Sequence, residues 1–147
     1  MLVSIYIDTE NNIPTKRLHR YGYVIETVIH DQAHTVNGFG EVDATFYVTV
    51  LTALKEALFR INKTCELMVV TRNSRIGYDL AKNLTKWEAN NWTRDAGKPV
   101  RGAELWKSVA ERLKMLKITE ISQFNTSRHD YSSWIQAEIK RKIMNEN

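Results

Sequence analysis

The sequence has only one cysteine, Cys65, and no long uninterrupted run of apolar residues. One cysteine cannot form an internal disulfide, which indicates a reducing environment. A membrane-spanning helix needs about 20 apolar residues. The first residues, MLVSIYIDTENN, also lack the basic region and the cleavage site of a signal peptide. The sequence therefore predicts a cytoplasmic protein that does not cross a membrane.

Residue patterns that mark several common functional sites are also missing. The four histidines do not have the spacing of metal ligands, and with one cysteine a zinc site is not expected. There is no glycine-rich phosphate loop, and we assign Gly38 and Gly40 to a turn. These absences argue against a zinc centre and against a nucleotide site of the phosphate-loop type.

The composition is that of a folded domain with an uneven distribution of charge. Of the 147 residues, 43% are hydrophobic and 26% are charged, which suits one domain over residues 1–147. The net charge is +4, and residues 82–117 carry nine basic and four acidic side chains, with three tryptophans among them. This pattern is compatible with nucleic-acid contact. Composition alone favours a solvated helical face with buried tryptophans, and both interpretations stay open.

Hydrophobic periodicity predicts nine elements. Five segments have the pattern of strands: residues 2–9, 21–29, 34–40, 65–71 and 118–124. A polar turn at residues 30–33 should join the second strand to the third. Four segments have helix signals: residues 43–61 with Asp43 as N-cap, a helix begun by Asn73 or Ser74, a helix from about Ala103, and residues 129–144 before a solvated tail.

The order of these elements predicts the fold class. Three consecutive strands joined by short connections should form an antiparallel unit, and strands separated by helices should pair in parallel through crossovers. The sequence therefore predicts an α/β protein with a five-stranded mixed sheet flanked by helices.

Specific residues on this framework resemble the type 1 ribonuclease H family. The first strand ends in an aspartate (IYIDTE, Asp8), the second begins with Tyr21-Gly22-Tyr23, and the first helix contains TALKEAL. The segment WTRDAGKPVRGAELW at residues 92–106 resembles the basic protrusion of the family and the helix after it, and CELMVVT resembles its central strand. The resemblance implies a ribonuclease H-like fold.

The resemblance also implies a hydrolytic site in which four carboxylates hold two Mg²⁺ or Mn²⁺ ions. Asp8 stands at the first of these positions. The second falls on Phe46 or Tyr47, the third on Arg72 (or on Asn73 with one residue of slippage), and the fourth on Ile135 or Gln136. The histidine that precedes the last helix in the family has its nearest matches in Thr126 and His129. Three of the four ligands are therefore missing, and the resemblance leaves catalytic activity undecided.

Two interpretations of Asp8 remain open. Glu10 and Asp43 are close enough along the predicted elements to move inward, so that Asp8, Glu10 and Asp43 would bind one Mg²⁺ or Mn²⁺ ion. Alternatively, Asp8 caps the strand end or pairs with Arg72. Arg72, near the position of the missing metal ligands, would repel a cation and could bind a phosphate instead.

We therefore expect a catalytically degenerate protein that needs no cofactor and binds nucleic acid, an RNA–DNA hybrid or another A-form duplex, through its backbone. The expected contacts are Arg72, Lys86, Trp92, Arg94, Lys98 and Arg101, whereas Trp87 and Trp106 are expected in the core. Two alternatives stay open. One is an active Mg²⁺-dependent ribonuclease H with a rearranged site, and the other is a protein-interaction module on the same scaffold.

Overall fold

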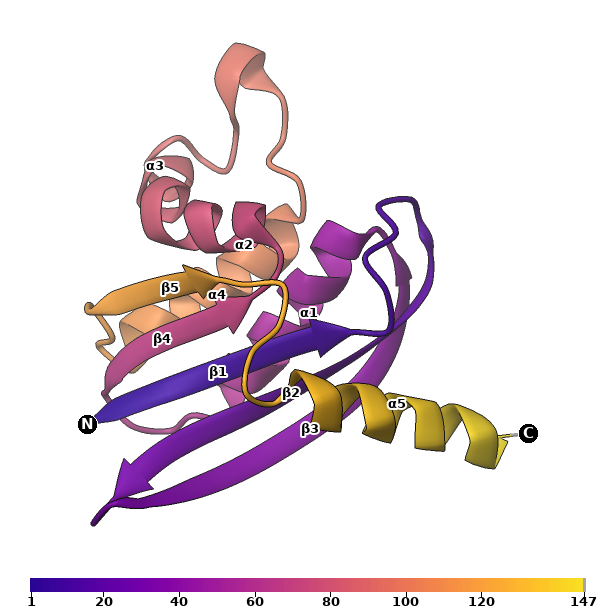
Figure 1. Cartoon of the computed structure of the whole chain (residues 1–147). Coiled ribbons are helices and arrows are strands. Elements are labelled where there is room, and N and C mark those ends of the chain that lie inside the picture. The colour runs from indigo at the N-terminus through magenta and orange to yellow at the C-terminus, as the bar shows by residue number, and fades with distance from the viewer. Residues whose placement is uncertain (147) are drawn as a thin grey trace.

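The protein, described over residues 1–146 by a computed structural model, is built on one five-stranded sheet (Figure 1). The strands are β1 (Leu2–Thr9), β2 (Arg17–Ile29), β3 (Gln32–Ala44), β4 (Glu66–Thr71) and β5 (Ile121–Asn125). Their order is β3-β2-β1-β4-β5. Neighbours are antiparallel from β3 to β1 and parallel from β1 to β5. The predicted α/β fold class with a mixed sheet is confirmed.

Helices cover both faces of this sheet. They are α1 (Phe46–Phe59), α2 (Ser74–Tyr78), α3 (Leu84–Ala89), α4 (Ala103–Met115) and α5 (Ser132–Glu146). A π-helical turn, Asp79–Asn83, joins α2 to α3. Helix α1 packs on β1, β2, β3 and α4, whereas α5 packs on β1 and β2 from the opposite face. Within residues 1–146, no helix has both the length and the apolar character needed to span a membrane.

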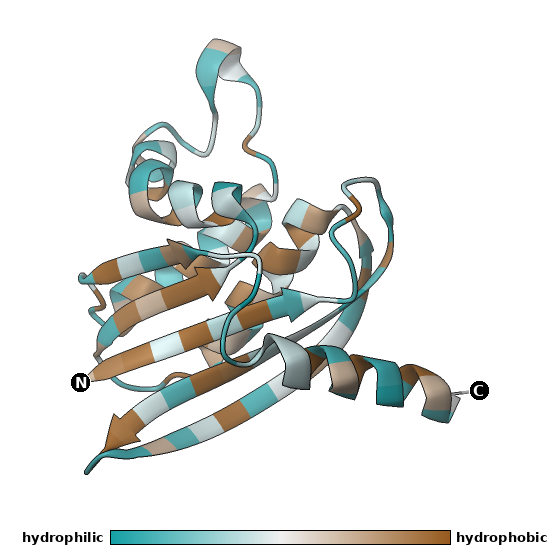
Figure 2. Ribbon diagram, viewed as in Figure 1, coloured by the Kyte–Doolittle hydropathy of each residue, from teal (hydrophilic) through white to brown (hydrophobic). Residues whose placement is uncertain are grey.

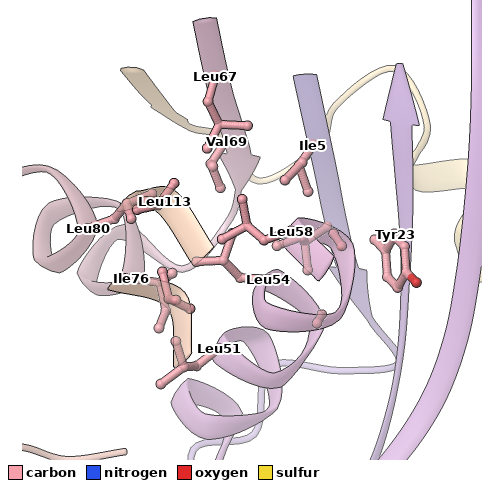
Figure 3. Packing of buried hydrophobic residues seen from close by; sticks show 14 of the residues in the cluster. Ile5, Tyr23, Leu51, Leu54, Leu58, Leu67, Val69, Ile76, Leu80 and Leu113 are labelled. Atoms are coloured by element: carbon pink, nitrogen blue, oxygen red, sulfur yellow. The ribbon is translucent and has the colours of Figure 1, made fainter. Parts of the chain in front are cut away.

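The main core lies between α1 and the sheet. Leu51, Leu54 and Leu58 of α1 are fully buried; Leu54 and Leu58 lie toward Ile5 of β1 and Val69 of β4, and Leu51 lies beside Ile76 of α2 (Figure 3). The central strand β4 is correspondingly one of the most apolar segments of the chain (Figure 2). Side chains of alternate residues enter the two faces of the sheet. A smaller second cluster therefore forms under α5 around Val24, Ile135 and Ile139.

The β2–β3 hairpin has longer strands and a shorter turn than the sequence predicts. Ile29 pairs with Gln32, so the turn consists of His30 and Asp31 alone, with φ angles of 52° and 63°. Positive φ at both central residues is the geometry of a two-residue hairpin turn whose twist matches the strands. The predicted four-residue turn is wrong. Gln32 and Ala33 pair with β2, although they lack the hydrophobic pattern that marks a strand in the sequence.

Gly38 and Gly40 lie within β3 and not in a turn, which corrects our assignment. The ring of Tyr23 lies against Gly38 and the ring of Tyr21 against Gly40, where a Cβ atom would collide with either ring. The two glycines therefore give space to aromatic rings from the neighbouring strand.

Helix α1 begins later than predicted. Asp43 is exposed within β3 opposite Leu18, and the N-cap is Thr45, whose Oγ1 accepts a hydrogen bond of 3.2 Å from the backbone of Val48. Asp43 as N-cap is wrong because β2 begins at Arg17, which extends the ladder to Ala44. The chain end also differs from the prediction: α5 continues through Glu146, so most of the expected tail is helical.

Tyr131, just before α5, is held to the sheet by Glu26 of β2. The Tyr131 hydroxyl donates to Glu26 Oε2, and this hydrogen bond, with burial and the nearby negative charge, raises the pKa of Tyr131 to about 12. A pKa raised above the unfolded value of about 10 stabilises the fold below pH 10, and this stabilisation is lost as pH rises through 12.

We therefore expect Glu26→Gln to return the pKa of Tyr131 toward 10, because the amide removes the charge. Absorbance titration of the phenols, with Tyr131→Phe subtracted, measures this pKa. An unchanged pKa in Glu26→Gln would contradict the assignment of its cause.

Candidate functional site

Asp8 and Arg72 lie together at the carboxyl end of the two central parallel strands. Asp8 is the penultimate residue of β1, Arg72 directly follows β4, and these strands pair in parallel. Asp8 is 4% exposed, and its Oδ1 accepts a hydrogen bond of 2.8 Å from the backbone N–H of Thr9. The Arg72 Nε atom is 3.5 Å from the same oxygen. The expected pairing of Arg72 with Asp8 is confirmed.

The Arg72 guanidinium is held by charge but is incompletely hydrogen-bonded. Its Nε atom is buried and has no hydrogen-bond acceptor in the described chain, although the side chain as a whole is 26% exposed. A buried donor without an acceptor costs about 1 to 3 kcal/mol. Arg72 therefore has unused capacity for an acceptor with a negative charge.

Tyr47, at the predicted position of the second carboxylate, is part of a buried polar network. Its hydroxyl donates to Asp79 Oδ2 at 2.6 Å and accepts from Trp106 Nε1 at 3.0 Å. Asp79 is 2% exposed. Its Oδ1 accepts a hydrogen bond of 2.7 Å from Asn83 Nδ2 and forms an ion pair with Arg75 Nε at 3.3 Å. Burial, with the hydrogen bond to Asp79, raises the pKa of Tyr47 well above its ordinary value. The network joins α1, α4 and the helical segment after β4.

The other predicted ligand positions are also occupied by structural contacts. Phe46 packs against the main core, and Asn73 is the N-cap of α2, its Oδ1 accepting from the Ile76 backbone at 3.1 Å. Ile135 of α5 is fully buried against the sheet, whereas the Gln136 side-chain amide donates to the carbonyl of Thr9. Gln136 is therefore the α5 residue that contacts the end of β1.

His129 is held in place by its ring nitrogens. Nε2 lies 2.9 Å from the Ile7 carbonyl, and Nδ1 accepts from the Tyr131 backbone at 3.1 Å, so the proton is assigned to Nε2. The Thr126 hydroxyl, the other nearest match to the family histidine, donates to the carbonyl of Arg128. Both side chains fix the segment between β5 and α5.

The residues at the carboxyl ends of β1 and β4 do not fit a two-metal centre. Asp8, Glu10 and Asp43 do not come together: Glu10 lies 3.7 Å from Arg20, and Asp43 is exposed on β3. Within residues 1–146, no three His, Cys, Asp or Glu side chains are grouped so that they could hold a metal ion. The predicted cluster is wrong because Asp43 lies in an extended strand and not on the first turn of α1.

A hollow of about 660 Å³ lies between α3 and the loop of residues 90–102. Its lining includes three of the predicted nucleic-acid contacts, Lys86, Arg94 and Lys98, together with Arg75 and Trp87. These three predicted contacts are exposed and have no ion-pair partner in the described chain. The hollow therefore presents three cations without an ion-pair partner in the described chain, beside one carboxylate, Asp95, and beside Arg75, which pairs with Asp79.

A second hollow, of about 330 Å³, connects this region with the Tyr47 network. Arg94 and Arg101 line it with Arg75, Trp87 and Asp79. The guanidinium of Arg101 lies over the Tyr47 ring, 5.2 Å from its centroid. Our sequence reasoning missed Arg75 and Asp79, and an Arg and an Asp four residues apart on a predicted helix were the available signal.

The tryptophans separate into different roles. Trp106 is fully buried as expected, and its ring centroid is 5.9 Å from that of Trp87. Trp87 is half-buried and also lines both hollows. Trp92, expected as a nucleic-acid contact, is half-buried against the main core. We therefore assign the Trp92 ring to anchoring the loop.

Comparison with known proteins agrees with this architecture, although no family model matches the chain. The chain is 28% identical over 106 residues to a ribonuclease H of Hydrogenovibrio crunogenus, covering 72% of each protein. It is 30% identical over 100 residues to a ribonuclease H of Rhizobium etli, covering 68% of this chain and 60% of that protein. For a ribonuclease H of Dichelobacter nodosus the chain spans 55% of the relative.

Solved structures with low sequence identity share the fold. LC9-RNase H1, a type 1 RNase H with the type 2 active-site motif, has a TM-score of 0.68 at 15% identity, over 97% of this chain and 69% of that one. The foamy viral protease-reverse transcriptase in complex with dsDNA has a TM-score of 0.67 at 17% identity, over 92% and 88%. The same viral protein in complex with an RNA/DNA hybrid has a TM-score of 0.65 at 18% identity, over 87% and 18%.

The sheet order and the helices on its two faces therefore define a ribonuclease H-like α/β protein. Within that class, the relatives that match in sequence are named ribonuclease H, and a type 1 RNase H is among the solved neighbours, which supports a type 1 ribonuclease H-like family.

Proposed function

We propose that this protein binds nucleic-acid duplexes, preferentially an RNA–DNA hybrid or another A-form duplex, through backbone contacts and without cutting them. The family relatives are named ribonuclease H, and the foamy viral neighbour was solved with dsDNA and with an RNA/DNA hybrid. A duplex that follows the same side of this fold would meet the carboxyl ends of the central strands and the loop after α3.

The observation that carries the proposal is the state of Arg72. Its guanidinium lies 3.5 Å from Asp8, with a buried Nε–H that lacks an acceptor in residues 1–146. The side chain is 26% exposed, and the exposed part of the guanidinium would donate to a phosphate oxygen, because guanidinium and phosphate form strong, charge-assisted hydrogen bonds. Arg72 would then hold a phosphate where family members are expected to hold metal ions, and it would not activate water.

The cationic hollow beside α3 supports the same proposal. Lys86, Arg94 and Lys98 are exposed and unpaired within the described residues, as a surface that tracks a phosphate backbone requires. Such contacts carry little sequence information, so we expect recognition by the shape and charge of the duplex.

The test of the proposal is a cleavage and binding assay with an RNA–DNA hybrid in Mg²⁺ and in Mn²⁺. We expect the hybrid to bind and to remain intact, because Tyr47, Arg72 and Gln136 stand at the ligand positions. Asp8→Asn is the matched variant. Cleavage by the wild-type protein that Asp8→Asn abolishes would establish an active nuclease, and a hybrid that does not bind would contradict the proposal.

Binding should become less salt-dependent when the loop loses its cations. The logarithm of the affinity falls linearly with the logarithm of the salt concentration. For a B-form duplex, we expect Lys98→Ala with Arg101→Ala to reduce the slope of this line by about 0.9 for each phosphate contact that is lost. Titrations of the same duplex at several salt concentrations measure this slope.

Lys140→Ala with Arg141→Ala is the control, since it removes the same charge from α5. If both double variants had the wild-type slope, the binding surface would lie elsewhere.

A further inference from the structure

Within residues 1–146, no helix covers one half of the sheet face that carries α5. In Figure 1, α5 and the segment before it cross the C-terminal part of β1 and the neighbouring part of β2, while the amino-terminal parts of β1 and β4 and the strand β5 stay uncovered on this face. Alternation along the strands places Leu2, Met68 and Phe124 on this face. Val28 joins them, because its neighbour Thr27 pairs with Val3.

These four side chains form a continuous apolar stripe across β2, β1, β4 and β5. Directly opposite residues on paired strands lie about 5 Å apart and diagonal neighbours about 7 to 8 Å apart. Leu2 lies beside Val28, Met68 is diagonal to Leu2, and Phe124 is diagonal to Met68. Val28 is 56% exposed, Leu2 45% and Phe124 59%, and Met68 is partly exposed. The stripe therefore presents large apolar side chains to solvent on a regular surface.

The charge around the stripe has one sign. Glu66 is the β4 partner of Leu2, and Glu26 is the β2 partner of Ser4, so a carboxylate flanks the stripe on each side. Glu66 is exposed and makes no ion pair within residues 1–146. The strand positions on this uncovered area include no lysine or arginine, although the chain as a whole has a net charge of +4. The side-chain charges on this area are therefore opposite in sign to the net charge of the molecule, and the amino terminus of Met1 lies beside the start of β4.

We propose that this stripe is the docking surface for a basic amphipathic helix of a partner polypeptide. Helix α5 shows that a helix packs well on this face, since Ile135 and Ile139 cover Val24 on the other half. A partner helix would bury its apolar side on Leu2, Met68 and Phe124, and lysines or arginines at its edges would pair with Glu26 and Glu66. The surface lies on strands, away from the hollow beside α3, and does not depend on the proposed duplex binding.

The probe for this surface is a helical peptide of about 18 leucine and lysine residues with one apolar side. We expect it to bind the full chain saturably and to shift the backbone NMR signals of the uncovered parts of β1, β4 and β5. A matched leucine–glutamate peptide should bind at least about tenfold more weakly, because Glu26 and Glu66 would repel it.

Phe124→Glu should weaken the leucine–lysine peptide about tenfold or more, and Val28→Glu is a second variant near the hairpin end. Phe59→Glu is the control, because Phe59 is 48% exposed but lies on α1. Dispersed spectra of the free variants establish that they fold. No saturable binding, equal binding of the two peptides, shifts on another face, or wild-type affinity in both Phe124→Glu and Val28→Glu would each overturn the proposal.

Discussion

A glutamate introduced at position 47 should destabilise the protein by about 3 to 5 kcal/mol, and it should not create a metal site. Tyr47 is 7% exposed and donates its hydroxyl to the buried carboxylate of Asp79 at 2.6 Å. Tyr47→Glu would place a second carboxyl group beside Asp79 in a buried position. There, the negative charge of one carboxylate disfavours ionisation of the other. Urea unfolding of the variant and the wild type measures the loss, and calorimetry with Mn²⁺ tests for a metal site.

Tyr47→Phe separates the effect of charge from that of the lost hydroxyl. It leaves Asp79 Oδ2 and Trp106 Nε1 without this partner, which should cost about 1 to 3 kcal/mol. The part of the Tyr47→Glu penalty that comes from charge should shrink as pH falls from 7 to about 4, because below about 4 the introduced carboxyl is protonated in the unfolded chain as well. Equal stability of the two variants at neutral pH would contradict our account of this network.

Arg72→Asp should weaken duplex binding by about tenfold or more, which corresponds to about 1.4 kcal/mol. The change removes the guanidinium that we propose as phosphate holder and puts a carboxylate in its place, which would repel the phosphate backbone. The same change adds a carboxylate next to Asp8, so weak Mn²⁺ binding should appear. Hydrolysis should not appear, because Tyr47 and Gln136 still occupy two ligand positions.

Calorimetry of Arg72→Asp with a hybrid and with Mn²⁺ measures both effects. Arg141→Asp is the control, because it makes the same charge change on the exposed side of α5. If Arg72→Asp bound the hybrid with wild-type affinity, Arg72 would be only the ion-pair partner of Asp8 and the proposed phosphate site would be wrong.

The elements whose signals are local were predicted well from the sequence. Strand β1 has the predicted bounds, since its alternation of apolar residues needs no distant partner to be recognised. Asn73 caps α2 as expected, because an N-cap acts within its own helix turn. The pairing of β1 with β4, and with it the meeting of Asp8 and Arg72, was expected from the resemblance to the ribonuclease H family and is confirmed.

The errors arose where a distant strand or helix decides the outcome. Asp43 and Thr45 are both good N-caps by residue type, and only the pairing of Arg17 with Ala44 assigns Asp43 to the strand. Glu10 was a reasonable metal ligand by its distance from Asp8 along the chain, but it lies beside Arg20 of the neighbouring strand. Trp92 stays a predicted nucleic-acid contact, but the packing of its ring on the core was not visible in the local sequence.

The sequence by itself determined the order of strands and helices, the faces they bury, and the absence of three expected carboxylates, because these depend on residue type and on spacing along the chain. Only the tertiary structure decided other contacts between side chains: Tyr47 with Asp79 and Trp106, and the apolar stripe that crosses four strands. Such contacts join residues far apart in sequence. Their partners depend on strand register and helix packing, which hydrophobic periodicity does not specify to within one residue.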